Sequence, residues 1–316
     1  MFSARSFRHA ALLTAGLTAA MGALAADHIV STKYGDVKVD NNVKRVVTLY
    51  EGALDISYAL GVNPVGAITT RGSDTVSTYL GDRTKGLKIV GTTRETNLEA
   101  VAAQHPDLIL ASSRLSPEQY KILSKIAPTI VPKSKPHSFP SWESETRLFA
   151  KALNKTAQGE AVIGRIHDRE ADIKNVVEVK IPKEKRNVSL IRWMPQGAMV
   201  MSTKIFSTEV LANTGFNVND GGIVKQGSPH SSALSLENLS SIDSEWVFLA
   251  TMNLEGQKSL DAAKKSPAFE RLNVVKKDHV IPVDGQVWTS GSGPIAASVI
   301  LDDIQKMLDT KVSYPE

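Results

Sequence analysis

The sequence predicts an α/β protein with two similar lobes, each with a central, mainly parallel sheet flanked by helices. Three observations lead to this prediction. Short β-branched runs alternate with helix-like segments, one helical pattern in the middle is unusually long, and the two halves share an ungapped repeat. Strands that alternate with helices form parallel sheets with covered faces. Two lobes joined by one rigid helix leave a cleft between them, where ligand sites usually lie.

Residues 1–26 are predicted to be a secretory signal peptide. Arg5 and Arg8 form a basic start, an Ala-rich apolar run follows, and Ala23-Leu24-Ala25 offers the small residues that precede a cleavage site. We expect cleavage after Ala25 or Ala26. The apolar run is shorter than the roughly 20 residues that span a bilayer, and no later segment is long or apolar enough, so we expect no membrane anchor.

The chain contains no Cys, which excludes disulfides, thiolate metal sites, thiol nucleophiles and bacterial lipid attachment. The formal net charge is +4, and it falls by two when Arg5 and Arg8 leave with the signal peptide. Such a mild balance permits an anionic ligand but argues against nucleic acid as a partner. We expect a monomer, free in a bacterial periplasm.

Residues 27–140 are predicted to form the N-terminal lobe. Its predicted strands are Val46–Leu49, Val65–Ile68, Lys88–Val90, Leu108–Ala111 and Thr129–Val131. Its predicted helices are Ala53–Leu60, Leu98–Gln104 and Pro117–Ile126. The regular alternation of the two kinds of segment is typical of a parallel sheet.

Residues 141–180 are predicted to contain two helices that connect the lobes. The first covers Ser141–Leu153, and the second runs from Lys155 to about Glu178 with apolar residues on one stripe. At 1.5 Å per residue the second helix is roughly 36 Å long, which suits a strut. Pro182 and the charged residues after it end the helix.

Residues 181–316 are predicted to form the C-terminal lobe. Its predicted strands are Val188–Ile191, Trp246–Leu249 and Val280–Val283, and its predicted helices are Ser207–Ala212, Leu236–Ser241 and Ile295–Leu308. The segment from Leu98 to Leu110 aligns without a gap on the segment from Leu236 to Phe248. The two lobes are therefore expected to share one plan.

Several segments resemble a known family. They are Arg45–Leu49 with Ala53-Leu54 and Leu60–Val62, then Val90-Gly91 with Leu98–Val101 and Pro106–Ile109, and finally Ser266–Phe269 through Val280–Val283 to Trp288. In order and spacing the sequence resembles the periplasmic binding proteins of ABC importers for ferric siderophores, haem and vitamin B12. The Gly91–Arg94 and Ser112–Arg114 stretches are most similar to iron-siderophore binders, including the ferric-citrate type.

Basic side chains follow the carboxyl ends of the predicted strands, where ligands bind in open α/β sheets. The predicted ligand-binding residues are Arg71, Arg94, Arg114, Arg192, Lys204, Tyr50, Trp193, Trp288 and His230. Guanidinium groups suit carboxylate, catecholate or hydroxamate oxygens, and aromatic faces cover an organic scaffold. Because a siderophore already coordinates its iron, we expect no intrinsic cofactor and no metal ligand from the protein. The alternatives are solvated arginines and tryptophans that belong to the core.

The resemblance gives His230 a second interpretation. In some catecholate-siderophore binders of the family, a His at this spacing before Glu237 completes the iron centre together with a Tyr near Trp288. Here Val287 and Thr289 flank Trp288, so that Tyr is missing. The alternative for His230 is an ordinary loop histidine.

Glu99 and Glu237 occupy equivalent places in the two half-repeats, after the predicted N-caps Asn97 and Ser235. The resemblance implies that one Glu per lobe docks on arginines of the inner-membrane ABC permease. The alternative is a favourable interaction of each carboxylate with its helix N-terminus.

Together these features predict a periplasmic receptor, not an enzyme, that carries an anionic ferric siderophore of citrate (hydroxycarboxylate) or catecholate type to an ABC transporter. The first alternative is a haem or cobalamin carrier, with Tyr50, Tyr79 or His137 as axial haem ligand. The second is a dinucleotide-dependent α/β enzyme, because Gly291–Ala296 matches the pattern G-x-G-x-x-A. A carrier of uncomplexed zinc or manganese would need clustered His and carboxylates, which the sequence lacks.

Overall fold

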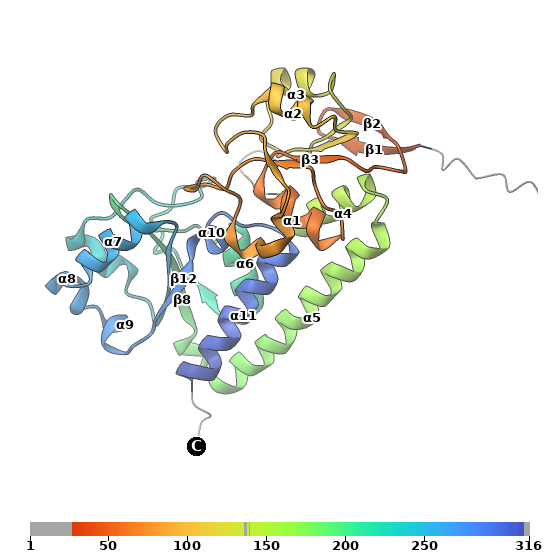
Figure 1. The fold of residues 1–316 in the computed structure, drawn as a ribbon. Coiled ribbons are helices and arrows are strands. Elements are labelled where there is room, and N and C mark those ends of the chain that lie inside the picture. Colours follow the sequence, from red (N-terminus) through yellow and green to blue (C-terminus); the bar gives the residue numbers. More distant parts are fainter. Residues whose placement is uncertain (1–26, 136–137, 139, 313–316) are drawn as a thin grey trace, which may run out of the picture.

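Two five-stranded sheets form the centres of two lobes in the computed structural model, which describes residues 27–135, 138 and 140–312 (Figure 1). Helices pack around both sheets, and the long helix α5 runs along one side of the molecule. The predicted α/β architecture with two lobes is thus confirmed. The predicted signal peptide, residues 1–26, lies outside the described residues.

The sheet of the first lobe has the strand order β5-β4-β3-β6-β7, and every pair in it is parallel. Its strands are β3 (Val46–Thr48), β4 (Gly66–Ala67), β5 (Lys88–Ile89), β6 (Leu108–Leu110) and β7 (Thr129–Ile130). Its helices are α1 (Glu51–Ala59), α2 (Leu98–Ala103), α3 (Pro117–Leu123) and the 3₁₀ helix η1 (Thr78–Thr84). Because the strands are parallel, all their carboxyl ends meet at one edge.

A hairpin of β1 (His28–Thr32) and β2 (Gly35–Val39) precedes this sheet and was not predicted. Only alternate residues are buried, with Val30 and Val39 fully covered, so no continuous apolar run marks the strands. The Lys33 amide donates to the Val131 carbonyl at 2.9 Å, which ties the hairpin to the chain after β7.

The sheet of the second lobe has the parallel order β10-β8-β11-β12, and β9 pairs with β8 in antiparallel fashion. Its strands are β8 (Asn187–Met194), β9 (Gly197–Val200), β10 (Asn217–Val218), β11 (Trp246–Thr251) and β12 (Val280–Asp284). Its helices are α6 (Phe206–Asn213), α7 (Leu254–Ala263), α8 (Pro267–Glu270), α9 (Asn273–Lys276), α10 (Gly285–Trp288), α11 (Pro294–Lys311) and the 3₁₀ helices η2 (Lys183–Lys185) and η3 (Leu236–Ile242).

The predicted repeat is present as α2 followed by β6 and η3 followed by β11. The two helices differ, because the Asn97 side chain caps α2 by accepting from the Ala100 amide, whereas Ser235 makes no side-chain cap bond to η3. Ser235 is the N-cap residue of the second copy, as predicted, but it makes no capping side-chain bond, and this second copy is a 3₁₀ helix.

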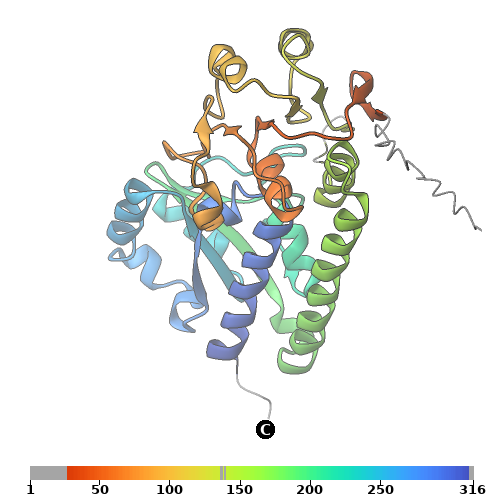
Figure 2. The ribbon, with the colours of Figure 1, turned by 45° about the vertical axis from the view of Figure 1, so that its right-hand side comes forward.

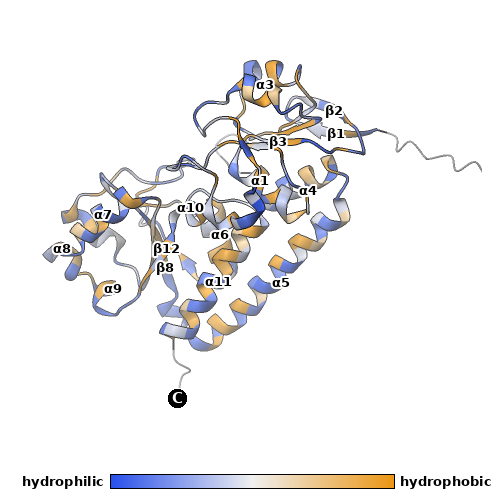
Figure 3. Cartoon of the chain, viewed as in Figure 1, coloured by the Kyte–Doolittle hydropathy of each residue, from blue (hydrophilic) through white to orange (hydrophobic). Residues whose placement is uncertain are grey.

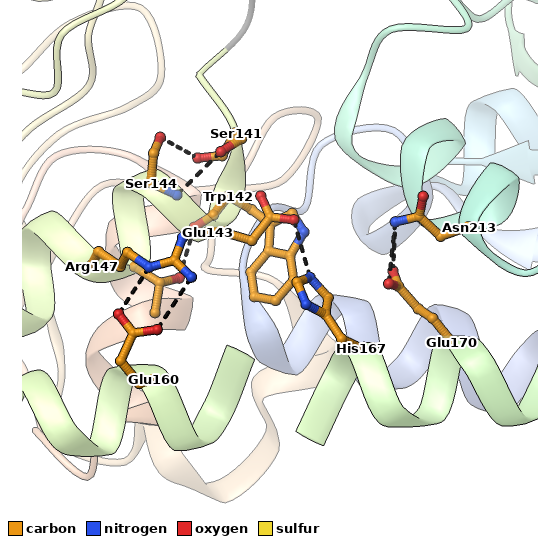
Figure 4. Close-up of polar contacts among 10 residues, drawn as sticks. Ser141, Trp142, Glu143, Ser144, Arg147, Glu160, His167, Glu170 and Asn213 are labelled. Carbon is orange, nitrogen blue, oxygen red and sulfur yellow. Dashed lines mark hydrogen bonds and ion pairs between the residues drawn. The ribbon is translucent and has the colours of Figure 1, made fainter. Parts of the chain in front are cut away.

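Helix α4 (Trp142–Ala152) and the 25-residue helix α5 (Thr156–Lys180) connect the lobes. Arg147 of α4 pairs with Glu160 of α5 at 2.8 Å, as Figure 4 shows. Further along α5, the buried Glu170 accepts from the Asn213 amide of α6 in the second lobe at 3.1 and 3.2 Å. Helix α5 is thus attached to both lobes.

Helix α11 makes a second connection between the lobes. It lies beside α5 in both ribbon views, and its apolar residues complete the core of the second lobe (Figures 1 and 2). Figure 3 shows apolar and polar residues alternating along α5 and α11, as expected for helices with one buried face. At its start, α11 meets α1 of the first lobe, where Asp55 accepts from the amides of Ile295 at 2.9 Å and Ala296 at 2.8 Å.

Within the part of the chain that the structure describes, none of the helices combines the length and the apolar character needed to cross a bilayer.

Candidate ligand site between the lobes

A cavity of about 390 Å³ opens at the carboxyl edges of both sheets and is lined by residues of both lobes. The first lobe contributes the residues that follow β3, β4 and β6 and the segment from Thr92 to Thr96. The second lobe contributes a residue of β8, the start of α6 and the segment from Trp288 to Ser292. The size is in the usual range for a small-molecule site.

Three of the arginines predicted to bind ligand line this cavity from the first lobe. Arg71, Arg94 and Arg114 come from three separate loops after strands, and all three are exposed. The Thr92 hydroxyl accepts from the Arg94 amide, and the Ser112 hydroxyl accepts from the Arg114 amide. These short-range bonds shape the loops in which the two arginines are presented.

Arg192 of β8 is the buried cation of the cavity, with 5% of its surface exposed. Its Nε is buried without a hydrogen-bond partner among the described residues, and its Nη2 donates to the Met199 sulfur at 3.5 Å. Burial, together with the positive charge of Arg71, lowers the pKa of Arg192 to about 10. No carboxylate forms an ion pair with Arg192 among the described residues.

Two buried hydroxyl groups of the second lobe also lack hydrogen-bond partners in the described part of the chain. Ser207 at the start of α6 and Ser290 both line the cavity, and the Oγ of each is buried without a hydrogen-bond partner. Buried polar atoms in proteins are nearly always satisfied. Three unsatisfied polar atoms around one cavity, those of Arg192, Ser207 and Ser290, therefore point to a guest that carries hydrogen-bond acceptors.

The cavity wall also contains the acidic residue Glu145, which was not predicted, next to Tyr50, which was. The Tyr50 hydroxyl donates to Glu145 of α4, and both residues line the cavity. Burial raises the pKa of Glu145 to about 7, while the bond from Tyr50 opposes the rise. Gly52 makes room for the Tyr50 ring, because a Cβ there would lie 2.5 Å from Tyr50 Cε2. Glu145 sits on the buried stripe of α4 with Trp142 and Phe149, and an acid in that position was the available signal.

The two tryptophans predicted at the cleft belong to the core. Trp193 is 1% exposed, packs edge-on against Phe269 and donates from Nε1 to the Ser259 hydroxyl. It lies within β8, where successive side chains point to opposite faces, so Arg192 faces the cavity and Trp193 does not. Trp288 borders the cavity but is fully buried, because it stacks on Phe248 at 4.5 Å.

Lys204 and His230 are not among the residues that line the cavity. Lys204 is exposed at the end of the loop before α6, and His230 is half-buried with Nδ1 at 2.7 Å from the Ser231 carbonyl. Glu99 and Glu237 are both exposed, in the first turns of α2 and η3.

The Gly-rich segment before α11 does not provide a dinucleotide site. Asp55 already accepts from the Ile295 and Ala296 amides, so the N-terminus of α11 binds a carboxylate of the protein. Gly293 has φ +115, and a Cβ there would lie 2.5 Å from Asp55 Oδ1. The close approach of α1 to α11 therefore requires this glycine. Its presence does not indicate a bound cofactor.

Two of the candidate haem ligands are engaged within the protein. The Tyr50 hydroxyl donates to Glu145, and the Tyr79 hydroxyl donates to Asp55 at 2.8 Å. His137 lies outside the described residues. Among the residues that the structure does describe, no group of three or more His, Asp or Glu side chains is arranged to hold a metal ion.

Comparison with known proteins identifies relatives along most of the chain. A probable siderophore-binding lipoprotein of Bacillus subtilis, YfiY, is 31% identical over 272 residues, which cover 84% of this chain and 82% of the relative. The Fe(3+)-citrate-binding protein YfmC of the same organism is 29% identical over 284 residues, covering 90% of this chain and 86% of the relative.

Solved structures show the same fold. Staphylococcus aureus SirA complexed with staphyloferrin B superposes with a TM-score of 0.78 at 25% identity, covering 91% of this chain and 100% of that one. The petrobactin-binding protein YclQ of B. subtilis superposes with a TM-score of 0.74 at 23% identity, covering 90% and 99%. The family model for periplasmic binding proteins matches residues 46–287. The chain therefore belongs to the periplasmic binding protein family.

Proposed function

We propose that this protein binds an anionic ferric siderophore in the periplasm and delivers it to an inner-membrane ABC transporter. The observation that carries the proposal is the buried, unpaired Arg192 in a cavity that three more arginines line. A buried cation without a partner is costly for the folded state. An anionic guest would supply the missing partner, together with acceptors for Ser207 and Ser290.

The energetics fit a ligand of this class. A hydrogen bond to a charged group contributes about 1.5–3 kcal/mol, and micromolar binding needs about −8 kcal/mol. Several arginine contacts, added to the burial of an organic scaffold, reach that range. The relatives support the choice of ligand, since their names include siderophore, Fe(3+)-citrate and achromobactin binders.

The lining favours a carboxylate-rich chelate over a flat aromatic one. Hydroxyl residues border the cavity at Thr92, Thr93, Ser112, Ser113, Ser207, Thr289, Ser290 and Ser292. The two tryptophans expected to cover an organic scaffold are buried, which leaves Tyr50 and Phe206 as the more accessible aromatic lining residues. Haem or cobalamin, with a large apolar macrocycle, matches such a polar surface poorly.

Titration of intrinsic tryptophan fluorescence tests the proposal. We expect saturable quenching by ferric citrate, ferric staphyloferrin B or ferric petrobactin, with weaker binding of ferric bacillibactin, a hydroxamate complex, haemin and cobalamin. Exclusive binding of haemin or cobalamin would contradict the proposed ligand class. Equilibrium dialysis that retains NAD would instead favour an enzyme.

The two predicted docking residues have a separate test. Replacing both Glu99 and Glu237 with Ala is expected to lower siderophore uptake by cells roughly tenfold while leaving affinity unchanged, because both carboxylates are exposed. The control is Glu255→Ala, which removes an exposed carboxylate from the first turn of α7. Normal uptake by the double variant would remove these residues from the permease interface.

The proposed function requires the protein to be exported to the periplasm. Residues 1–26 have the features of a cleaved export signal, and the named relatives include periplasmic binding proteins of Dickeya dadantii and Escherichia coli. N-terminal sequencing of the exported protein, which we expect to start at Ala26 or Asp27, checks the cleavage site.

A further inference from the structure

Glu145 is a buried carboxyl group in the wall of the ligand cavity, and nothing in the proposed capture of an anion explains it. Its side chain is 5% exposed, and its only hydrogen bond among the described residues is the one that Oε2 accepts from the Tyr50 hydroxyl. No cation forms an ion pair with it in that part of the chain. Oε1 is therefore the atom that remains to meet a guest.

Helix α4, which carries Glu145, packs mainly against α5, α1 and β1. Helix α1 contributes Glu51 and Asp55, whose negative charges both act on Tyr50. On α5, Glu160 and His167 pair with Arg147 and Glu143 of α4, and β1 contributes His28, which bonds to Asn41. The other charged residues that line the cavity are Arg71, Arg94, Arg114, Arg192, Glu51 and Glu95.

An anionic guest changes the balance between the two forms of Glu145. It excludes water and places negative oxygens beside the carboxyl group. Each of these changes disfavours an ionised Glu145. The neutral form is within reach, because burial raises the pKa of this group to about 7.

We propose that Glu145 takes up one proton from solvent when a ferric siderophore binds, and that its carboxyl group then donates a hydrogen bond from Oε1 to an oxygen of the guest. This inference rests on the proposed function and adds a specificity-determining residue to the site. The site would thereby select acceptor oxygens at this wall and bind more tightly as the pH falls toward neutral.

Calorimetric titration at about pH 8, in two buffers with different heats of ionisation, measures the proton uptake directly. The probes are ferric staphyloferrin B, ferric citrate and ferric petrobactin. We expect uptake of roughly half to one proton, and an affinity that falls by up to about tenfold per pH unit above pH 7.5. Glu145→Gln, which is always neutral, should lose both effects. Glu255→Gln, which removes an exposed carboxylate that does not line the cavity, should keep them.

Tyr50→Phe provides a second, independent variant. It removes the hydrogen bond that stabilises the ionised Glu145, so the fall in affinity should begin at higher pH than in the unmodified protein. If Glu145→Gln does not fold, an unchanged pH profile in Tyr50→Phe overturns the inference.

The two proposals fail in different ways. If none of the three chelates binds, the proposed function is contradicted and the role of Glu145 falls with it. If a chelate binds without proton uptake, or with the same uptake in Glu145→Gln, only the role of Glu145 is overturned.

Discussion

Replacing Arg192 with Met is expected to weaken ferric siderophore binding by roughly 30-fold or more and to make the protein more stable. The loss follows because removing one member of a buried, hydrogen-bonded charge pair costs about 2–5 kcal/mol of binding free energy. The gain follows because the Arg192 guanidinium is buried and its Nε has no hydrogen-bond partner among the described residues. An apolar side chain of similar length there should raise the free energy of unfolding by about 1–3 kcal/mol.

Denaturant unfolding and ligand titration of the same variant separate the two effects. The matched control is Arg165→Met on α5, which removes an exposed arginine and should change neither quantity appreciably. If Arg192→Met binds normally, the guest does not reach this side chain. If affinity and stability fall together, Arg192 supports the fold and the assignment to the site is wrong.

Replacing Asp55 with Ala is expected to lower the free energy of unfolding by about 3 kcal/mol or more. The fully buried Asp55 accepts from the Ile295 and Ala296 amides and from the Tyr79 hydroxyl. Its removal leaves three donors without partners, and each buried unsatisfied group costs about 1–3 kcal/mol. For a chain of this size the melting temperature should drop by roughly 10 °C. Asp172→Ala, on the exposed face of α5, is the control.

The same variant should change the pH dependence of stability. Burial raises the pKa of Asp55 to about 7, so between pH 4 and 7 the folded protein binds a proton that the unfolded chain has released. The stabilisation from this proton is complete below the unfolded pKa and is lost as the pH rises through 7. The free energy of unfolding should therefore fall from pH 5 to pH 7, and less steeply in Asp55→Ala. An equal slope in both proteins would contradict this protonation.

Local patterns were sufficient to predict the sheets and the strut. The β-branched runs predicted β3, β6 and β11 within a few residues, and the apolar stripe predicted α5. The pattern predicted β8 to end at Ile191, whereas the strand continues to Met194. That extension decides the site, because strand alternation turns Arg192 to the cavity and Trp193 into the core.

Other features could not be predicted, because they depend on contacts between distant segments. Asp55 meets its partner amides 240 and 241 positions later, so its role as a link between lobes has no local signal. The Gly291–Ala296 pattern was ambiguous for the same reason, since the carboxylate that occupies the helix N-terminus comes from α1. Glu145 had a local signal, an acid on an apolar stripe, but its partner Tyr50 is 95 positions earlier.

The junction of α1 with α11 has a consequence for unloading. The long helix α5 and the buried junction of α1 with α11 both join the two lobes. We therefore expect the lobes to keep much the same arrangement with and without ligand. Release of the ligand then cannot depend on spontaneous opening of the two lobes. We expect contact with the transporter to open the junction of α1 with α11, so that the ligand is released only at the transporter.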